Sequence, residues 1–328
     1  MILAGDIGGT KTALALFEEE SDGRLRQVRE LTAANADYAS FEEIARLFLR
    51  EGPRPALHAA VLAAAGPIIG GHCQVTNLAW VLDEQELARV LGTPRVKLLN
   101  DLEAAGYGML HLPPEEYAVL NEGRPRRSGN IAVLSAGTGL GEALLYWDGR
   151  QHHPTASEGG HADFAPRTEQ EIELLRSLRA QLGDDHVSCE RVLSGSGIQN
   201  VYRFLRDSGV APEPPWLAER LRTGDASAAI TALGVNGEDP LCAATVELFA
   251  AMYGAEAGNL ALKYLAVGGV FVGGNIAVAL LPVLQKSGFM HAFTDKGRFR
   301  DLLQSIEVRV ALNPRAPLLG AAYFALRL

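Results

Sequence analysis

Two short glycine-rich turns in this chain have the composition of anion-binding loops. Residues 6–10 read Asp-Ile-Gly-Gly-Thr and residues 135–139 read Ser-Ala-Gly-Thr-Gly, and each turn follows a short apolar run. Strand-like residues continue beyond the turns, at 12–17 and 142–147, so both copies are typical of β-hairpins. Glycine lets backbone N–H groups converge on an anion, and the threonine hydroxyls add donors. Either turn alone is more typical of an ordinary tight hairpin, but two such turns can bind one polyphosphate.

Other glycine patterns narrow the kind of nucleotide site. A P-loop requires Gly-Lys-Ser or Gly-Lys-Thr at the start of a helix, and no Gly-Lys dipeptide occurs in the 328 residues, which excludes P-loop ATPases. A third glycine-rich segment, residues 268–275, has glycine pairs on both sides of a short apolar strand and leads into a helix at Ile276. Its backbone amides can face a nucleotide, although a sharp strand-to-helix turn would need the same glycines.

Asn100 and Asp101 are candidates for chemistry because they directly follow the apolar strand expected at 96–99. A helical segment, 102–106, comes next, and ligands of α/β sheets bind at the carboxyl ends of strands. There the Asp101 carboxylate can accept a proton from a substrate hydroxyl, and the Asn100 amide can both donate and accept a hydrogen bond. The alternative is that Asp101 only caps the following helix.

A further group of polar residues has the chemistry of a sugar-binding site. Residues 158–163 read Glu-Gly-Gly-His-Ala-Asp, and Glu190 lies farther along the chain. Carboxylates accept two hydrogen bonds and histidine can donate or accept one, which suits the adjacent hydroxyls of a polyol. The same residue types also bind metals, but the chain has no His-x-x-x-His spacing, so polyol binding fits better.

An alternation of strands and helices in the first third of the chain must position these residues. After the first hairpin, apolar periodicity and turn residues predict a helix, a strand, a second helix and a second strand. These elements are expected at 40–51, 58–64, 83–91 and 96–99. Such alternation is typical of an α/β domain.

The middle of the chain is more helical. Thr168 and Glu171 have the spacing of a capping box at the start of an amphipathic helix. Further helices are predicted at 243–266 and 276–287. Residues 211–240 are rich in Pro, Gly, Asp and Ala and are expected at the periphery.

The length of 328 residues exceeds what one hydrophobic core usually organises, so we expect two domains. The last elements are a strand at 306–312 and a closing helix at 317–326, in which Gly320 allows close packing. We expect the chain to return to its first domain here. The predicted domains are a small α/β domain, residues 1–109 with 312–328, and a large α+β domain, residues 110–311.

Bulk composition excludes several classes of partner. The net charge of −9 would repel nucleic-acid phosphates, and the small basic cluster at 124–127 is expected to be a solvated loop. No apolar run approaches the roughly 18–20 residues that span a bilayer, so no membrane insertion is expected. Cys73, Cys189 and Cys242 are widely spaced, which argues against disulfides and a zinc cluster. No targeting segment precedes the first strand at Met1, so we expect a cytoplasmic protein.

The order of these motifs resembles that of bacterial glucokinases, within the hexokinase, acetate kinase, Hsp70 and actin superfamily. The resemblance runs almost from end to end. It is carried by residues 5–10, 100–101, 136–141, 158–164, 190–197, 268–275, 295–299 and 317–320. It implies a two-domain α/β sugar kinase of the ribonuclease-H-like (actin-like ATPase) fold, with a central cleft for glucose, ATP and Mg²⁺. It also implies a homodimer that phosphorylates glucose at the 6-hydroxyl, the first step of glycolysis.

The resemblance implies the role of each candidate sugar residue. Asp101 would be the general base that accepts the proton of the reacting hydroxyl, and Asn100 would be a sugar ligand. Glu158, His161 and Glu190 would bind the remaining hydroxyls. Phosphoryl transfer requires mainly alignment and charge neutralisation, so the base only has to receive one proton.

The resemblance likewise implies an ATP site at the glycine turns. The residues expected to hold its phosphates are Asp6, Gly8, Gly9, Thr10, Gly137, Thr138 and Gly139. Gly273 and Gly274 would lie near the adenosine, and Asp6 would lie close to Mg²⁺ through water. Lys11 departs from the family pattern, in which a smaller polar residue often follows the threonine, and it can either touch phosphate or face solvent.

Two rival functions use related folds. A sugar-sensing regulator would keep the fold and lose turnover, but such regulators usually carry a DNA-binding helix-turn-helix ahead of the first strand. An actin- or Hsp70-like ATPase would not need the pair 100–101 or the polyol set at 158–161. The related ROK sugar kinases share the Glu-Gly-Gly-His sequence but usually add a cysteine-rich zinc motif, which this chain lacks.

Overall fold

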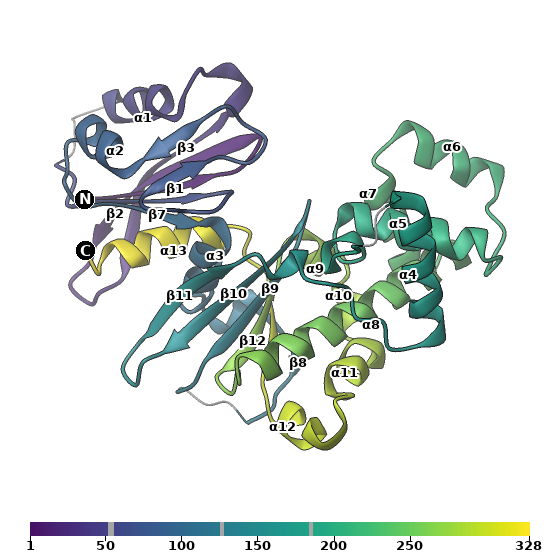
Figure 1. Cartoon of the computed structure of the whole chain (residues 1–328). Coiled ribbons are helices and arrows are strands. Elements are labelled where there is room, and N and C mark those ends of the chain that lie inside the picture. The colour runs from purple at the N-terminus through teal and green to yellow at the C-terminus, as the bar shows by residue number, and fades with distance from the viewer. Residues whose placement is uncertain (52–55, 125–127, 184–185) are drawn as a thin grey trace. The chain divides into compact units, whose positions relative to one another are not determined.

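The computed structural model describes residues 1–51, 56–124, 128–183 and 186–328. Most of the basic cluster predicted as a solvated loop, residues 125–127, lies outside this description. The chain forms two compact units, coloured along the chain in Figure 1. The first unit contains Met1–Pro114, His152–Ala156 and Asn313–Leu328, and the second contains Glu115–Gln151 and Ser157–Leu312.

The first unit is built on a mixed five-stranded sheet with the order β3-β2-β1-β4-β7. Its strands are β1 (Ile2–Ile7), β2 (Lys11–Glu19), β3 (Leu25–Ala34), β4 (Ala59–Ala64) and β7 (Val96–Asn100). The strands β1, β4 and β7 run parallel, whereas β1, β2 and β3 pair antiparallel. The predicted hairpin at the first glycine turn is therefore confirmed. A separate two-stranded ribbon joins β5 (His72–Gln74) and β6 (Val81–Asp83).

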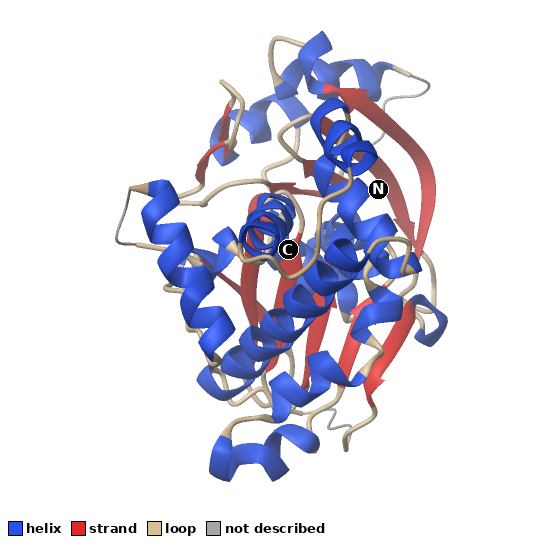
Figure 2. Ribbon diagram, turned by 90° about the vertical axis from the view of Figure 1, so that its right-hand side faces the viewer, coloured by secondary structure: helices blue, strands red, loops and turns tan. Residues whose placement is uncertain are grey.

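Helices cover both faces of the first sheet because alternate strand residues are apolar on each side. Leu3 and Ile7 of β1 belong to the core that includes α1 (Phe41–Arg50) and α2 (Glu84–Leu91). Ile2 and Ala4 belong to the core that includes α3 (Asp101–Met109) and α13 (Ala316–Ala325). Figure 2 shows helices in blue packed against strands in red.

The helices α3 and α13 approach so closely that only glycine fits at their contact. A Cβ atom on Gly108 would lie 1.9 Å from the carbonyl oxygen of Ala316, and one on Gly320 would lie 1.8 Å from that of Ala104. The predicted close packing of the closing helix at Gly320 is confirmed. This contact holds the helix that begins at Asp101.

A six-stranded sheet has the order β11-β10-β9-β12-β13-β8, and all of its strands lie in the second unit except β11, most of which belongs to the first unit. Its strands are β8 (Tyr117–Asn121), β9 (Ile131–Ala136), β10 (Leu140–Trp147), β11 (His152–Ser157), β12 (Gly269–Gly273) and β13 (Val308–Ala311). The strands β9, β12 and β13 run parallel, and β9 and β10 form the predicted second hairpin. If β8 is left aside and the strands of each large sheet are numbered by their order along the chain, both sheets have the spatial order 3-2-1-4-5.

Helices bury the inner face of the second sheet. They include α4 (Glu169–Leu182), α5 (Gly195–Asp207) and the long α8 (Pro240–Lys263), whose apolar residues share one core with β9 and β12. The shorter helices are α6 (Pro215–Thr223), α7 (Ala226–Asn236) and α12 (Arg300–Gln304). Within the described part of the chain, no helix is both long and apolar enough to cross a membrane.

Three local predictions for the second unit need correction. The helix expected at 276–287 is broken into α9 (Asn275–Ala279) and α10 (Leu281–Leu284), with α11 (Ser287–Thr294) following, because Pro282 cannot donate to a continuous helix. The segment expected at the periphery forms α6 and α7, and α7 is buried against α8. The capping box is only half formed, since Thr168 caps α4 but the Glu171 carboxylate accepts from the Arg167 backbone.

Candidate active site

The end of β7 presents Asn100 and Asp101 side by side at the start of α3. Asn100 is the N-cap: its Oδ1 accepts from Leu102 N–H at 3.0 Å, and Glu103 accepts the Asn100 N–H at 2.9 Å to complete a capping box. The Asn100 amide also donates to the Gly66 carbonyl at 3.1 Å. Asp101 is the first helical residue, with Oδ1 accepting from Leu102 N–H at 2.9 Å. The N-cap position that was the alternative for Asp101 therefore belongs to Asn100.

The structure brings a second carboxylate, Asp6 of β1, within electrostatic reach of Asp101. Burial, and to a lesser extent the negative charge of Asp101, raise the pKa of Asp6 to about 6. Within the described chain, no group of three or more His, Cys, Asp or Glu residues could hold a metal ion. Mg²⁺ typically uses one or two carboxylates and completes its shell with water and substrate phosphates, so Asp6 fits such an ion.

A buried asparagine braces the first glycine turn. The Asn35 side chain accepts from the Thr12 hydroxyl at 2.8 Å and donates to the Gly8 carbonyl at 2.8 Å, while its backbone N–H donates to Thr10 at 2.9 Å. The Gly8 N–H donates to the Lys11 carbonyl at 3.0 Å, so this amide is used inside the hairpin. The Lys11 side chain is exposed. Asn35 was not predicted from the sequence, because its only local signal is a polar residue after β3, a strand that the apolar pattern does not reveal.

The second glycine turn is held by Glu190 and by the start of α5. The Gly137 N–H donates to the Gly139 carbonyl at 2.8 Å, and Gly195 N–H donates to the Gly137 carbonyl at 2.9 Å. Glu190 Oε2 accepts from the Leu140 N–H at 3.0 Å and occupies the place of a side chain at Gly139, 2.4 Å from its ideal Cβ. The structure therefore brings a predicted sugar ligand against a predicted phosphate turn, with one carboxylate oxygen already bound to that turn. Thr138 lies at the tip between the two glycines.

The third glycine segment lies directly beside the second turn. The neighbouring strands β9 and β12 are parallel and pair Gly273 with Ser135, and Gly274 has φ 87° with its ideal Cβ only 2.2 Å from the Ala136 carbonyl oxygen. The fully buried Tyr253 hydroxyl accepts from Ala136 N–H at 3.1 Å and lies 3.3 Å from the Gly273 carbonyl, to which it donates. The second glycine turn, after β9, and the third, after β12, thus lie at the carboxyl ends of adjacent parallel strands, where ligands of α/β sheets bind.

His161 is the last residue of the short helical turn η3 (Gly159–His161), which follows β11, and Glu158 is the residue directly before that turn. Both side chains are largely exposed, with Glu158 Oε2 3.9 Å from His161 Nε2. An ideal Cβ on Gly160 would lie 2.0 Å from the Leu140 carbonyl, so η3 presses onto the end of the second glycine turn.

A backbone bond joins η3 to the segment that carries Glu190. The Cys189 N–H of η4 (Cys189–Arg191) donates to the Ala162 carbonyl at 2.9 Å. In the second unit, the structure thus brings the predicted polyol residues and the predicted phosphate turn together. Tyr253 and Cys189 were not predicted from the sequence as parts of this framework, because their partners are distant along the chain.

Comparison with known proteins identifies the family of the chain. Residues 3–328 match the family model for glucokinase. The glucokinase of Nostoc punctiforme is 42% identical over 339 residues, which covers 100% of this chain and 99% of that protein. A crystal structure of glucokinase from an Antarctic psychrotroph is 31% identical, with a TM-score of 0.87, and covers 100% of this chain and 99% of that one.

A third comparison bears on the fold alone. The crystal structure of glucokinase from Balamuthia mandrillaris in complex with glucose is 24% identical, with a TM-score of 0.80, and covers 99% of this chain and 93% of that one. The family match and the identity to the Nostoc protein extend over essentially the whole chain, as the order of its motifs predicted. The chain belongs to the glucokinase family.

Proposed function

We propose that this protein transfers the γ-phosphoryl group of ATP to the 6-hydroxyl of glucose and forms glucose 6-phosphate, the first step of glycolysis. The observation that carries the proposal is the contact between Glu190 and the Gly137–Gly139 turn, since the carboxylate of a candidate sugar ligand lies against a candidate phosphate-binding turn. Membership of the glucokinase family over residues 3–328 supports the same activity.

Asp101 is the proposed catalytic residue. Its carboxylate accepts the proton of the sugar's 6-hydroxyl while Asn100 binds a neighbouring hydroxyl. The capping box supports these roles because it fixes the backbone of both residues relative to α3. Phosphoryl transfer is governed by positioning, so this rigidity contributes directly to rate.

The remaining sugar hydroxyls are assigned to Glu158, His161 and Glu190. The two long, exposed side chains at η3 can each reach a hydroxyl, and Glu190 retains a second oxygen for one. Carboxylate acceptors and an imidazole together suit a ring of adjacent hydroxyl groups.

The ATP phosphates are assigned to the two hairpin turns, at Asp6–Thr10 and Gly137–Gly139, and the adenosine to Gly273 and Gly274. The contact between the last two turns supports a shared nucleotide site. When bound near Asp6, Mg²⁺ would neutralise charge on the β- and γ-phosphate oxygens. The raised pKa of Asp6 supports this assignment, because a nearby cation would relieve the repulsion from Asp101.

The finer architecture is also a proposal. We infer two ribonuclease-H-like domains, residues 1–109 with 312–328 and residues 110–311. The repeated 3-2-1-4-5 strand order supports this inference. A homodimer in the cytoplasm follows from the same family resemblance.

A coupled assay of glucose 6-phosphate formation tests the proposed activity. Purified protein with Mg-ATP should turn over glucose faster than mannose or fructose. Absence of turnover with every sugar, despite measurable sugar binding, would contradict the enzyme and favour a sugar-sensing regulator.

A further inference from the structure

Glu142 is a buried carboxyl group with no role in the proposed chemistry. It lies near the start of β10, two residues beyond Leu140, and is 1% exposed. Among the residues that the structure describes, none forms a hydrogen bond with its Oε1 atom. An ionised carboxylate in such a place is costly, whereas a protonated carboxyl is tolerated better.

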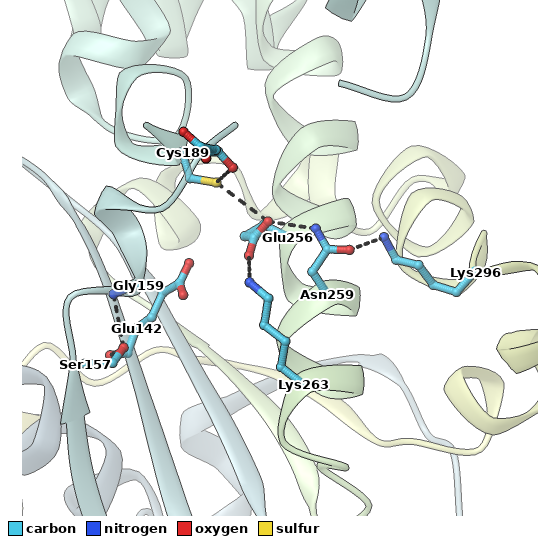
Figure 3. A network of polar contacts seen from close by, with 9 residues as sticks. Glu142, Ser157, Gly159, Cys189, Glu256, Asn259, Lys263 and Lys296 are labelled. Carbon is cyan, nitrogen blue, oxygen red and sulfur yellow. Dashed lines mark hydrogen bonds and ion pairs between the residues drawn. The ribbon is translucent and has the colours of Figure 1, made fainter. Parts of the chain in front are cut away.

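The nearest charges do not neutralise Glu142. Figure 3 shows it beside Glu256 and Lys263 of α8. Lys263 Nζ lies 3.3 Å from Glu256 Oε1, so the single lysine is already paired with the other carboxylate. Burial, and after it the negative charge of Glu256, raise the pKa of Glu142 to about 7 despite an opposing effect of Lys263. The remaining titratable groups that face Glu142 are Tyr253 of α8 and Cys189 of η4.

The Glu142 carboxyl lies directly against η3. Its Oε2 atom is 2.1 Å from the ideal Cβ position of Gly159, so the carboxyl fills the space that a side chain at Gly159 would take. The backbone is tied to the same turn, because Ser157 Oγ donates to the Glu142 carbonyl at 2.9 Å and accepts from Gly159 N–H at 3.2 Å. Any movement of this carboxyl is therefore transmitted to the backbone between Glu158 and His161.

The same cluster reaches the segment that carries Glu190. Cys189 Sγ donates to Glu256 Oε2 at 3.7 Å, and Glu256 also accepts from Asn259, which accepts from Lys296 at 2.6 Å (Figure 3). Ionisation of Glu142 would place a negative charge near that of Glu256. The repulsion would act on η3, which Glu142 contacts, and on the segment that carries Glu190.

We propose that Glu142 is a positioning residue that holds a proton beneath η3, and that release of this proton to solvent displaces η3 and weakens glucose binding. An ionised Glu142 needs water or a new donor at Oε1, and it repels Glu256; both effects disturb the packing at Gly159. The inference rests on the proposed roles of Glu158 and His161 as glucose ligands. Because Glu142 touches no reacting atom in this account, KM for glucose changes with its ionisation and kcat does not.

The test measures the Kd of glucose by calorimetry, together with KM and kcat, from about pH 6 to about pH 8.5. The proteins are the wild type, Glu142→Gln and a matched control, Glu247→Gln, which makes the same change at an exposed position of α8. We expect Kd and KM of the wild type and the control to rise roughly three- to tenfold over this range, while Glu142→Gln keeps the low-pH values.

The outcomes separate the two proposals. A wild type that binds glucose without turning it over contradicts the proposed function and leaves the pH dependence of Kd as the test of Glu142. The inference is overturned if the Kd of glucose for the wild type does not change with pH, or if the Kd for Glu142→Gln changes as much as that of the wild type. Absence of glucose binding also overturns it. If Glu142→Gln fails to fold, infrared titration of the wild type must show a carboxylic-acid C=O band that disappears in parallel with glucose affinity; its absence also overturns the inference.

Discussion

Asp101 is the residue on which the proposed reaction depends most. Replacing it with alanine removes the group that accepts the hydroxyl proton and leaves the glycine turns unchanged. We expect kcat of Asp101→Ala to fall roughly 100-fold or more, with little change in the Kd of ATP. Steady-state kinetics and calorimetry would measure the two quantities. Retention of near wild-type kcat would exclude Asp101 as the base.

The buried side chain of Asn35 is expected to contribute to the stability of the first glycine turn. Its replacement with alanine leaves the Thr12 hydroxyl and the Gly8 carbonyl without their buried partner. We expect Asn35→Ala to lower the free energy of unfolding by about 1–3 kcal/mol and to weaken ATP binding. Urea denaturation would measure the loss. The matched variant Asn236→Ala, at an exposed site, should change stability by less than about 0.5 kcal/mol, and equal losses in both would contradict the bracing role.

Local sequence was informative for residues whose chemistry follows from their neighbours in the chain. The glycine turns and Asn100–Asp101 were found because a strand, a turn and a polar residue occur in consecutive positions. Asn35, Glu142 and Tyr253 were missed because each acts through partners far away in sequence, such as the 117-residue separation between Tyr253 and Ala136. The roles assigned to the candidate site residues themselves stay predictions.

At the scale of elements, the crossing of α3 and α13 positions the start of α3. Gly320→Ala would place a methyl group where the structure has the backbone of Ala104. We expect a loss of about 1–3 kcal/mol in unfolding free energy, because packed helix backbones can separate only by disturbing the core. Thermal or urea denaturation would measure it.

The control for this substitution is Gly288→Ala in α11. An ideal Cβ at Gly288 meets no atom within 4 Å, so alanine should be neutral or stabilise by up to about 1 kcal/mol. If Gly320→Ala proved as stable as Gly288→Ala, the contact between the helices would not depend on glycine.

Elements with strong local periodicity were predicted well, and those defined by tertiary context were not. The helices at α1, α2 and α8 and the strands at β4 and β12 were all found from apolar patterns. The strand β3 was not predicted because most of its residues are exposed and it lacks a regular alternation of buried and exposed positions. The break near Pro282 could have been anticipated, since proline in a helical pattern ends or kinks the helix.

At the scale of the whole molecule, Glu142 predicts how stability depends on pH. Its pKa is about 7 in the folded protein against an ordinary value of 4.5, so the folded state binds more protons than the unfolded state between these values. The contribution of Glu142 to stability therefore falls as pH rises from 4.5 to about 7 and is constant above. We expect this loss to reach on the order of 3 kcal/mol.

The measurement compares urea unfolding of the wild type and Glu142→Gln across that range. The variant should lose less unfolding free energy than the wild type as pH rises, so that the two curves diverge towards neutral pH. Parallel curves would contradict the raised pKa of Glu142.

The repetition of one strand order is the main feature of the whole fold. From sequence, the repeat was visible only as two glycine hairpins, because the later parallel strands share no local pattern. The membership of the glucokinase family, predicted from the order of motifs, is confirmed. The domain boundaries stay a prediction.

The identity of the reaction product tests the proposed activity most directly. Phosphorus NMR of the wild type with Mg-ATP and glucose would follow ATP, ADP, inorganic phosphate and sugar phosphates in one sample. We expect glucose 6-phosphate and ADP in equal amounts, with no product in Asp101→Ala on the same time scale. Release of inorganic phosphate without a sugar phosphate, or phosphorylation at another hydroxyl, would contradict the proposed activity.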